Sequence, residues 1–396
     1  MLFPDLYCSL FFKRSYFLTL LLTVYQVVEL MKAKIFVIGC ILSICGLFSP
    51  NASAQDIHFS QFYMSPLNLN PALTGIMNCN MRVSSNYRNQ WSSVLKADAF
   101  KTYNVSYDQK IPVARADYFG LGVTVWGDQA GEGNFGTLQA KISGSYAKKL
   151  AGDRNSAHYL SAGVEVGIAG RTIDYLNFRY GNQANGDGVF DPDLQSFESY
   201  GRDRFLFADM SAGILWFSVF DKRNSAYVGG AYSHLNRANM SFNLNDQSTV
   251  VNIYPKYTIH AGGEIGTRGP ISIIPGVVTF FQGPSWQVNG GSSIRFNLHS
   301  GPFDESSFQV GTWARVASFV DWGANQGLAT PTNVTYGLDA LILSMRFDWR
   351  QFGLGFSYDV NMSELKAASN GNGAFEFSLI YTICGPEKRH VFCPKF

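Results

Sequence analysis

Leu341-Ile-Leu-Ser-Met-Arg-Phe-Asp-Trp-Arg350 alternates apolar and polar side chains along its length. Met345 and Phe347 fall on one face of an extended chain, whereas Arg346 and Asp348 fall on the other. A period of two residues is the pattern of a β-strand that has one apolar and one polar face. A surface helix would instead repeat its apolar side chains every three to four residues. The stretch therefore predicts a strand that separates an apolar from a polar environment.

The same unit, a run of alternating polarity followed by a turn cluster, recurs from Cys79 to the end of the chain. Such regular repetition predicts an all-β fold. The predicted strands, fourteen in number with an uncertainty of two, are 79–90, 98–110, 117–127, 134–149, 156–170, 205–218, 225–235, 255–267, 270–282, 285–297, 305–318, 334–347, 352–361 and 374–384.

A soluble sandwich also alternates, so composition and strand length must separate it from a membrane barrel. Only 15% of the 396 residues are charged, against about 25% in an average protein. The predicted strands are long enough to cross a bilayer at a tilt, and an even strand number suits a single-chain bacterial barrel. Aromatic residues also recur near strand ends, as in an interfacial girdle: Trp91, Tyr118, Trp126, Trp216, Tyr254, Trp286, Trp322 and Trp349. The sequence therefore predicts a transmembrane outer-membrane β-barrel of about fourteen antiparallel strands.

The first residues have the pattern of an export signal. Met31-Lys-Ala-Lys supplies a positive start, 35–48 an apolar run, and Ala52-Ser-Ala54 a small-residue cleavage site. We expect translation to start at Met31 and cleavage to follow Ala54. Three parts result, namely an upstream extension with a signal peptide (1–54), an N-terminal segment (55–78) and a barrel with a short tail (79–396).

The segment that follows the cleavage site is apolar but irregular. Pro66 and Pro71 exclude a long helix or a central strand, yet the stretch is too apolar for a solvated linker. We therefore expect it to pack into the mouth or lumen of the barrel as a plug, or to contact a periplasmic partner. The candidate residues are Gln61, Phe62, Tyr63, Pro66, Leu67, Asn68, Asn70, Pro71 and Gly75.

A polar motif in the first predicted strand has two interpretations. Either it contacts the N-terminal segment or a partner, or Arg88 pairs with a luminal carboxylate while Trp91 marks an interface; the second is favoured. A Tyr-Asp pair in the thirteenth predicted strand belongs to the same set of candidates. The residues are Asn86, Tyr87, Arg88, Gln90, Trp91, Tyr358 and Asp359.

The longest gap between predicted strands, 172–204, is rich in Gly, Asn and Asp. Its oxygen ligands Asn185, Asp187, Asp191 and Asp193 are spaced as in a calcium-binding loop. The full acidic pattern and the terminal Glu are missing, so a solvated acidic loop is the favoured alternative.

Three cysteines remain after the predicted cleavage. Cys384 and Cys393 could close a small loop in an oxidising compartment, and unpaired cysteines are the alternative. No pair of these cysteines has the spacing of a zinc site. The sequence contains no Gly-x-Ser-x-Gly nucleophile elbow. The formal net charge is only +2. We therefore expect no catalytic residues, no metal, no cofactor and no nucleic-acid partner.

Several motifs together resemble one family. Gln61-Phe-Tyr63 with Pro66-Leu-Asn-Leu-Asn-Pro-Ala-Leu-Thr-Gly75 is similar to the opening of PorP/SprF proteins, the outer-membrane proteins of the type IX secretion system and gliding machinery of Bacteroidetes. Further matches are 86–91, Ser106-Tyr-Asp108, Tyr227-Val-Gly-Gly with His234-Leu235, Tyr358-Asp359 with Ser363-Glu-Leu365, Phe375-Glu376, Tyr381 and Cys393-Pro-Lys-Phe396. The acidic loop and the tail fit the family less well.

The resemblance implies an outer-membrane barrel that works in protein export. Its partners would be outer-membrane lipid and proteins of the type IX machinery, with either a peptidoglycan-binding lipoprotein or a surface adhesin among them. A channel or a transporter of hydrophobic solutes is the alternative, because a barrel with an N-terminal plug suits that function as well. An occluded lumen would favour the secretion role, and an open, charge-lined lumen would favour transport.

Overall fold

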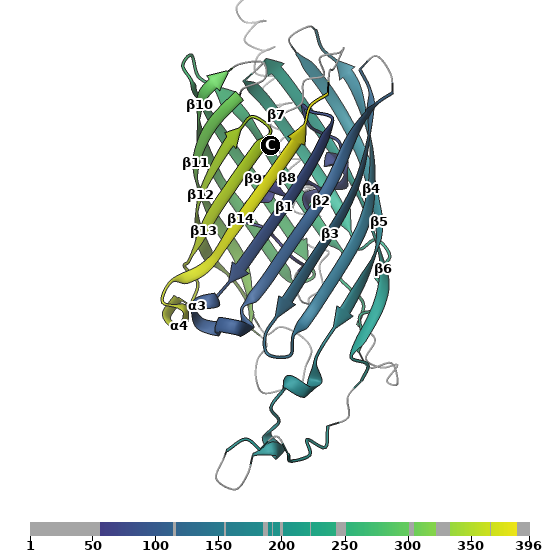
Figure 1. Ribbon diagram of the computed structural model, residues 1–396, viewed down its shortest axis with the longest axis vertical. Coiled ribbons are helices and arrows are strands. Elements are labelled where there is room, and N and C mark those ends of the chain that lie inside the picture. The colour runs from purple at the N-terminus through teal and green to yellow at the C-terminus, as the bar shows by residue number, and fades with distance from the viewer. Residues whose placement is uncertain are drawn as a thin grey trace, which may run out of the picture. The chain divides into compact units, whose positions relative to one another are not determined.

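Fourteen antiparallel strands form a closed barrel in the computed structural model (Figure 1). The fold class and the number of strands predicted from the sequence are both confirmed. The structure describes residues 56–113, 116–153, 156–184, 189–191, 193–198, 201–221, 223–242, 251–300, 305–321, 333–364 and 366–385.

The strands follow the predicted segments to within a few residues at their ends. They are β1 (Met81–Gln90), β2 (Phe100–Pro112), β3 (Tyr118–Ala130), β4 (Phe135–Ala151), β5 (Ala157–Thr172), β6 (Arg204–Asp221), β7 (Asn224–Ser233), β8 (Lys256–Gly266), β9 (Ile271–Gln282), β10 (Ser285–Ser300), β11 (Glu305–Asp321), β12 (Asn333–Trp349), β13 (Phe352–Asn361) and β14 (Asn372–Ile383). Each strand pairs with its sequence neighbours, and β1 also pairs with β14, from Met81 opposite Ile383 to Gln90 opposite Ala374. This last pairing closes the ring, so each of the described strands is paired on both sides and has no free edge.

The helical elements are all short. They are η1 (Phe62–Met64), α2 (Pro66–Leu69), η2 (Pro71–Leu73), α3 (Ser92–Leu95), η3 (Lys96–Asp98), η4 (Tyr175–Asn177), η5 (Gly181–Gln183) and α4 (Lys366–Ser369). Within the described ranges, no helix is long and apolar enough to cross a membrane.

The barrel wall carries its apolar side chains outward and its polar side chains inward. On β12, Leu343 and Met345 are 48% and 49% exposed, whereas the alternate residues Ser344 and Arg346 are buried. A water-soluble protein would bury the larger apolar side chains, but a lipid-facing wall exposes them because its solvent is itself apolar. The alternation read from the sequence is therefore the alternation between lipid and lumen.

The expected aromatic girdle needs a correction on β3. Tyr118 and Trp126 are 1% and 7% exposed, so they do not lie at the outer interface. Both share the parity of Thr124, a buried luminal residue of the same strand, and therefore point inward. Side chains of a strand alternate between lumen and lipid, so an aromatic residue at a strand end is interfacial only if its position in this alternation is on the outer face.

The two ends of the barrel differ in the length of their connections. At the end where β2 and β14 finish, the longest connections between described strands are 113–117 and 152–156. At the other end, 173–203 joins β5 to β6 and 234–255 joins β7 to β8. We call these the short-turn end and the long-loop end. Outer-membrane barrels have short periplasmic turns and longer extracellular loops, so we assign the short-turn end to the periplasm.

Candidate functional site

Residues 56–78, which we call the luminal segment, run inside the barrel from its long-loop end to its short-turn end. The Asp56 backbone N–H donates to Gln282 Oε1 at the end of β9, at 2.8 Å. Lys110 Nζ, near the end of β2, donates to the Met77 carbonyl at 3.2 Å. Since β9 ends at the long-loop end and β2 at the short-turn end, the segment passes from one mouth of the barrel to the other.

Two prolines give the luminal segment its irregular form. Pro66 is the first residue of α2 and Pro71 is the first residue of η2. A proline ring fixes φ and removes the backbone N–H, which suits the first turn of a helix and interrupts a longer one. The Asn70 side chain accepts from the Ala72 backbone N–H at 2.9 Å and caps η2. The segment therefore folds as a series of short turns.

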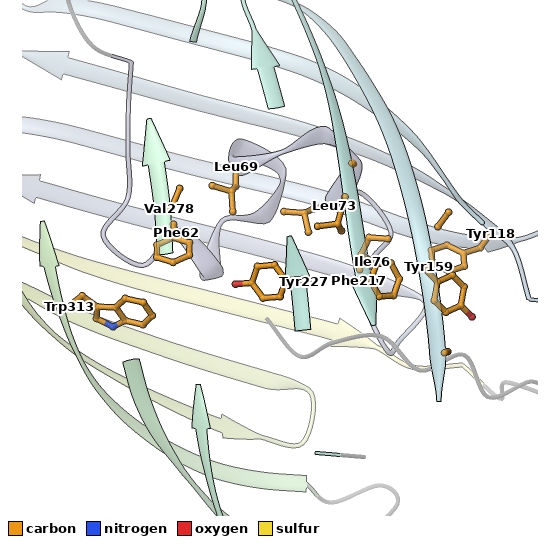
Figure 2. Close-up of a cluster of buried hydrophobic side chains, with 14 of the residues drawn as sticks. Phe62, Leu69, Leu73, Ile76, Tyr118, Tyr159, Phe217, Tyr227, Val278 and Trp313 are labelled. Carbon is orange, nitrogen blue, oxygen red and sulfur yellow. The ribbon is translucent and has the colours of Figure 1, made fainter. Parts of the chain in front are cut away.

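Apolar side chains of the luminal segment pack against aromatic side chains of the wall. Figure 2 shows Phe62, Leu69, Leu73 and Ile76 within one buried cluster. The wall residues of that cluster include Tyr118, Tyr159, Phe217, Tyr227, Val278 and Trp313. The Phe62 ring meets Trp313 edge to face, with 5.6 Å between the ring centroids. Burying side chains of this size stabilises by about 1.5–3 kcal/mol each, so packing holds the middle of the segment.

Wall side chains also bond to the backbone of the luminal segment. Glu376 accepts from the Ser60 and Gln61 backbone N–H groups at 2.6 and 2.9 Å. Ser145 Oγ donates to the Thr74 carbonyl at 2.6 Å. An irregular chain cannot satisfy its own buried N–H and C=O groups, and unsatisfied groups would each destabilise it. The luminal wall supplies the missing partners.

Glycines on the wall allow the luminal segment to approach closely. A Cβ atom built on Gly120 would lie 2.1 Å from the Thr74 carbonyl oxygen. On Gly163 it would lie 2.4 Å from the Pro71 carbonyl oxygen, and on Gly213 it would lie 2.0 Å from Asn70 Oδ1. Real Cβ atoms do not approach other atoms this closely, so any larger residue at these positions would displace the segment.

A buried charged cluster holds the start of the luminal segment. Arg88 Nη1 lies 2.5 Å from Glu376 Oε1, and Arg88 Nη2 lies 3.0 Å from Asp359 Oδ2. Arg315 also pairs with Asp359. Arg88 and Arg315 each donate to Ser60 Oγ at 2.7 Å. Because Ser60 sits between the two guanidinium groups, the cluster ties the segment to β1, β11, β13 and β14 together.

A second cluster holds the long-loop end of the segment through His234, which follows the last residue of β7. His234 Nε2 lies 2.7 Å from Asp56 Oδ2, and His234 Nδ1 lies 2.7 Å from Asp209 Oδ1. Burial favours the neutral ring, but the two carboxylates outweigh burial and raise the pKa of His234 to about 9. Burial would raise the pKa of the Asp56 carboxyl, but His234 and Lys256 hold it below its usual range. Both groups are therefore charged at neutral pH.

The His234 contact predicts a loss of stability in alkaline solution. A His whose pKa is raised by folding stabilises fully below its unfolded pKa of 6.5 and loses that contribution as the pH rises through about 9. A pKa shift of this size contributes about 3 kcal/mol to the free energy of unfolding. We expect the unfolding temperature to fall between pH 7 and pH 10, and to fall less in His234→Gln. Equal falls in both proteins would contradict this role.

The path of the luminal segment predicts the side of the membrane that its beginning faces. An epitope placed directly before Asp56 should leave the barrel at the same end as loop 173–203. Antibody should therefore bind this epitope on intact cells, as it should bind an epitope in that loop. An epitope in the 350–351 turn should be reached only after the outer membrane is permeabilised. If the Asp56 epitope behaves like the turn epitope, the assigned path is wrong.

The other end of the segment is anchored beside β1 and β2. The Gly75 backbone N–H donates to Asp108 Oδ2 at 2.7 Å, and Gly75 has a positive φ of 72° that favours glycine. Arg82 pairs with the same Asp108 oxygen at 2.7 Å. Arg82 also donates to the carbonyls of Leu73 and Ile76, each at 3.3 Å. These contacts turn the chain out of the lumen toward Cys79.

The expected pairing of Cys384 with Cys393 is wrong. Cys384 forms a disulfide with Cys79, with 4.3 Å between their Cα atoms. Cys79 precedes β1 and Cys384 follows β14, so ring closure brings together two cysteines that are 305 residues apart in sequence. Cys393 lies outside the described residues. Proximity in sequence favoured the wrong partner because the strand pairing that closes the barrel is not a local feature.

The disulfide links the residue range before β1 to the range after β14, so its removal should destabilise the closed barrel. We expect Cys79→Ser to lower the free energy of unfolding by about 2–4 kcal/mol. The measurement is thermal unfolding in detergent, followed by the gel mobility that distinguishes folded from unfolded barrels. Cys393→Ser is the control and should leave the transition unchanged. Identical transitions for Cys79→Ser and the wild type would contradict a stabilising role.

The remaining candidate residues lie in two different environments. Tyr63 packs against Trp313 with 5.6 Å between ring centroids, and Asn68 Nδ2 donates to Ser65 Oγ at 2.8 Å. Asn86, Arg88, Leu67 and Asp359 are buried, whereas Tyr87 is exposed on the outer wall. Gln90 accepts from Arg88 at 3.3 Å, Trp91 packs on Phe100 at 5.4 Å, and Tyr358 donates to Asn372 at 3.0 Å.

The expected calcium loop falls partly outside the described residues. Asn185 and Asp187 lie outside the described residues, and Asp193 donates its backbone N–H to Asp191 Oδ1 at 3.0 Å. In the part of the chain that the structure describes, no group of three or more His, Cys, Asp or Glu side chains could hold a metal ion.

Sequence reasoning missed several residues of the two charged clusters. Asp56, Asp209 and Arg315 were not predicted, although each binds a side chain that holds the segment in place. Lys141, which pairs with Asp209 at 2.9 Å, was not predicted either. The available signal was a charged residue on the polar face of a predicted strand, since that face lines the lumen. Their partners could not be found, because they lie on strands that are distant in sequence.

Comparisons with known proteins identify one family. The model of the family "Type IX secretion system membrane protein PorP/SprF" matches residues 51–381. A search of curated protein sequences finds no significant match.

Similar solved structures include CdiB from Escherichia coli, with 7% identity, coverage of 76% of this chain and 63% of that chain, and a TM-score of 0.41. A bacterial polysaccharide outer membrane secretin is 8% identical, with coverage of 78% of this chain and 99% of that chain and a TM-score of 0.32. CdiB from Acinetobacter baumannii is 10% identical, with coverage of 77% of this chain and 60% of that chain and a TM-score of 0.36. The chain thus spans less than two thirds of either CdiB. Because the family model covers most of its length, this outer-membrane barrel belongs to the PorP/SprF family of type IX secretion system membrane proteins.

Proposed function

We propose that this chain is a non-catalytic barrel of the type IX secretion and gliding machinery whose lumen is closed by its own luminal segment. The observation that carries the proposal is the fixation of this segment along its whole path. It is bound at Asp56 by His234, at Ser60 by Arg88 and at Gly75 by Asp108. A segment held at both mouths and in between favours a closed scaffold over a pore.

A closed barrel can serve export by presenting surfaces to protein partners. In this proposal it supports the export or surface attachment of an adhesin-like cargo, or it connects the machinery to the cell envelope through a peptidoglycan-binding lipoprotein. Loop 173–203 supports a contact at the cell surface, since Leu176 and Phe197 are 88% and 84% exposed beyond the strands. Large apolar side chains exposed to water favour contact with another protein.

The luminal polar groups support a structural rather than a catalytic role. Arg88 is engaged by Glu376 and Asp359, and His234 is engaged by Asp56 and Asp209. His260 Nε2 contacts the Asn70 side chain at 3.0 Å. A general base or a nucleophile must be able to reach a substrate, whereas these side chains reach the luminal segment.

Deleting the gene tests the proposal directly. We expect one or a few exported proteins to disappear from the cell surface and the medium, as measured by quantitative mass spectrometry, and to return with the full-length chain. The chain with Gly144→Ala is a matched control, because a Cβ added at Gly144 meets nothing within 4 Å. An unchanged set of exported proteins would contradict the proposal.

A channel or a hydrophobic-solute transporter is the alternative, and one observation favours it. In the described part of the structure, the buried hydroxyls of Ser272 on β9 and Ser293 on β10 have no hydrogen-bond partner. Buried hydroxyls of this kind are usually satisfied by water, so this side of the lumen is suited to hold water. If the deletion strain loses uptake of a small solute and keeps its exported proteins, the channel is the better account.

A further inference from the structure

We propose that the lumen is a peptide-binding groove, occupied in cis by the luminal segment and able to bind a segment of another polypeptide in trans. This inference rests on the proposed function, because a component of an export machine meets polypeptides in transit. The ligand class is an extended, irregular stretch of chain that carries an Asn-Pro step between apolar residues.

The wall bonds to the backbone of its occupant before and after α2. Side chains from β1, β2, β4, β5, β8, β9 and β14 contact N–H or C=O groups along the whole segment. The residues contacted in this way are Asp56, Ile57, Ser60, Gln61, Met64, Ala72, Leu73, Thr74, Gly75, Ile76 and Met77. Every polypeptide offers the same backbone groups, so this part of the recognition does not depend on the ligand's sequence.

The shape of the groove belongs to the wall rather than to the occupant. Gly120, Gly163 and Gly213 leave space on three different strands where the occupant's backbone or the Asn70 side chain approaches. Gly144 shares the outer face of β4 with the exposed Ile142 and Tyr146, and there an added Cβ has nothing within 4 Å. At Gly120, Gly163 and Gly213 the missing side chains coincide with the path of the bound chain, as expected of a groove built for a polypeptide.

A few positions select for side chains. Asn70 Nδ2 lies 3.1 and 3.2 Å from the carbonyl oxygens of Ile214 and Gly230, and Asn70 Oδ1 accepts from Ala72. An apolar side chain at this position would make none of these hydrogen bonds. Phe62 fills the space beside Trp313. The groove therefore selects an aromatic residue followed, further along, by an asparagine.

The present occupant has little structure of its own. Its helical turns η1, α2 and η2 contain only three or four residues each, and helices this short are unstable alone in water. Outside the barrel it would be an unfolded peptide. Its conformation therefore comes from the wall, as the conformation of a bound ligand does.

Cutting the full chain between the segment and the barrel tests whether the occupant is exchangeable. Asn78 is exposed and lies directly before Cys79, so a protease site inserted there can be cleaved in the folded protein. After cleavage, we expect a fluorescent peptide of residues 55–78 to replace the cut segment with saturable binding. The uncut protein should not bind it, because the tethered segment has a much higher effective concentration.

Matched variants report whether binding uses the groove. The peptide with Asn70→Ala should bind about tenfold more weakly, because the hydrogen bonds of Asn70 to the Ile214 and Gly230 carbonyls and to the Ala72 N–H are lost. Gly213→Val in the cut barrel should weaken binding at least as much, whereas Gly144→Ala should leave it unchanged. An unrelated peptide of equal length and charge should not compete.

Three outcomes would overturn the inference. They are a cut segment that never exchanges while the barrel stays folded, a barrel that unfolds on cleavage as judged by gel mobility, and equal binding of the unrelated peptide. None of these outcomes bears on the deletion experiment, which uses the uncut chain. Failure of the groove and failure of the proposed export role are therefore distinguishable.

Discussion

Replacing Arg88 with methionine should lower the free energy of unfolding of the barrel by about 3–5 kcal/mol and free the start of the luminal segment. Arg88 contacts Glu376, Asp359 and Ser60 at 2.5, 3.0 and 2.7 Å, and it is buried. Methionine keeps most of the volume but removes the charge, so Arg315 alone must compensate two buried carboxylates. Thermal unfolding in detergent measures the loss, and limited proteolysis near Ser60 measures the release of the segment.

Arg88→Lys separates the loss of charge from the loss of geometry. Lysine keeps the positive charge, but its single ammonium group lacks the planar fork with which arginine spans two carboxylates, so we expect an intermediate loss. Glu132→Gln is the surface control, because Glu132 is exposed. An Arg88→Met protein that unfolds at the wild-type temperature, with its segment still protected from protease, would show that the cluster does not hold the segment.

Gly120→Val should push the luminal segment away from β3 and open the lumen near the short-turn end. A Cβ atom at Gly120 would lie 2.1 Å from the Thr74 carbonyl oxygen and 2.5 Å from Ser145 Oγ. The segment backbone must therefore shift, which breaks the bond from Ser145 to Thr74 and strains the bond from Gly75 to Asp108. Forcing extra atoms into a packed site destabilises by about 1–3 kcal/mol. Protease cleavage within the segment should increase correspondingly.

Gly144→Val provides the matched control on the next strand. Gly144 is also a strand glycine, but an added Cβ there meets nothing within 4 Å. We expect its effect on stability to stay within about 0.5 kcal/mol and its segment to remain protected. If Gly120→Val and Gly144→Val behave alike, close approach at Gly120 does not hold the segment in place.

The sequence predicted the barrel well because the strands of a membrane barrel have a local pattern of alternating polarity. Each strand must alternate between lipid and lumen, and this period of two residues can be read in Leu341–Arg350 without knowing any other strand. The turn clusters then marked the strand ends to within a few residues. The two prolines of the segment likewise predicted irregular structure between Gln61 and Gly75.

Contacts between distant strands could not be predicted in the same way. Cys79 pairs with Cys384 only because β1 meets β14, and a local reading favoured Cys393 instead. Arg88 was expected to pair with a luminal carboxylate, but the sequence could not indicate that Glu376 and Asp359 both lie within reach. The partners of a luminal charge depend on strand register around the ring, which alternation alone does not define.

The inward-facing charges also explain how a barrel can hold an irregular segment. Arg82, Asp108 and Glu376 point into the lumen, and all three bond to the segment. Charged side chains provide strong hydrogen bonds to backbone groups. The same residues that would line an aqueous pore therefore serve here as the binding site of a polypeptide.

The central claim, that residues 56–78 close the barrel, is tested most directly by single-channel conductance of the purified protein in a planar bilayer. The full-length protein should be silent, and a variant that lacks residues 55–75 should show stable conductance steps. Gly144→Val should be as silent as the wild type. Steady conductance of the full-length protein would contradict the closed barrel and favour the channel.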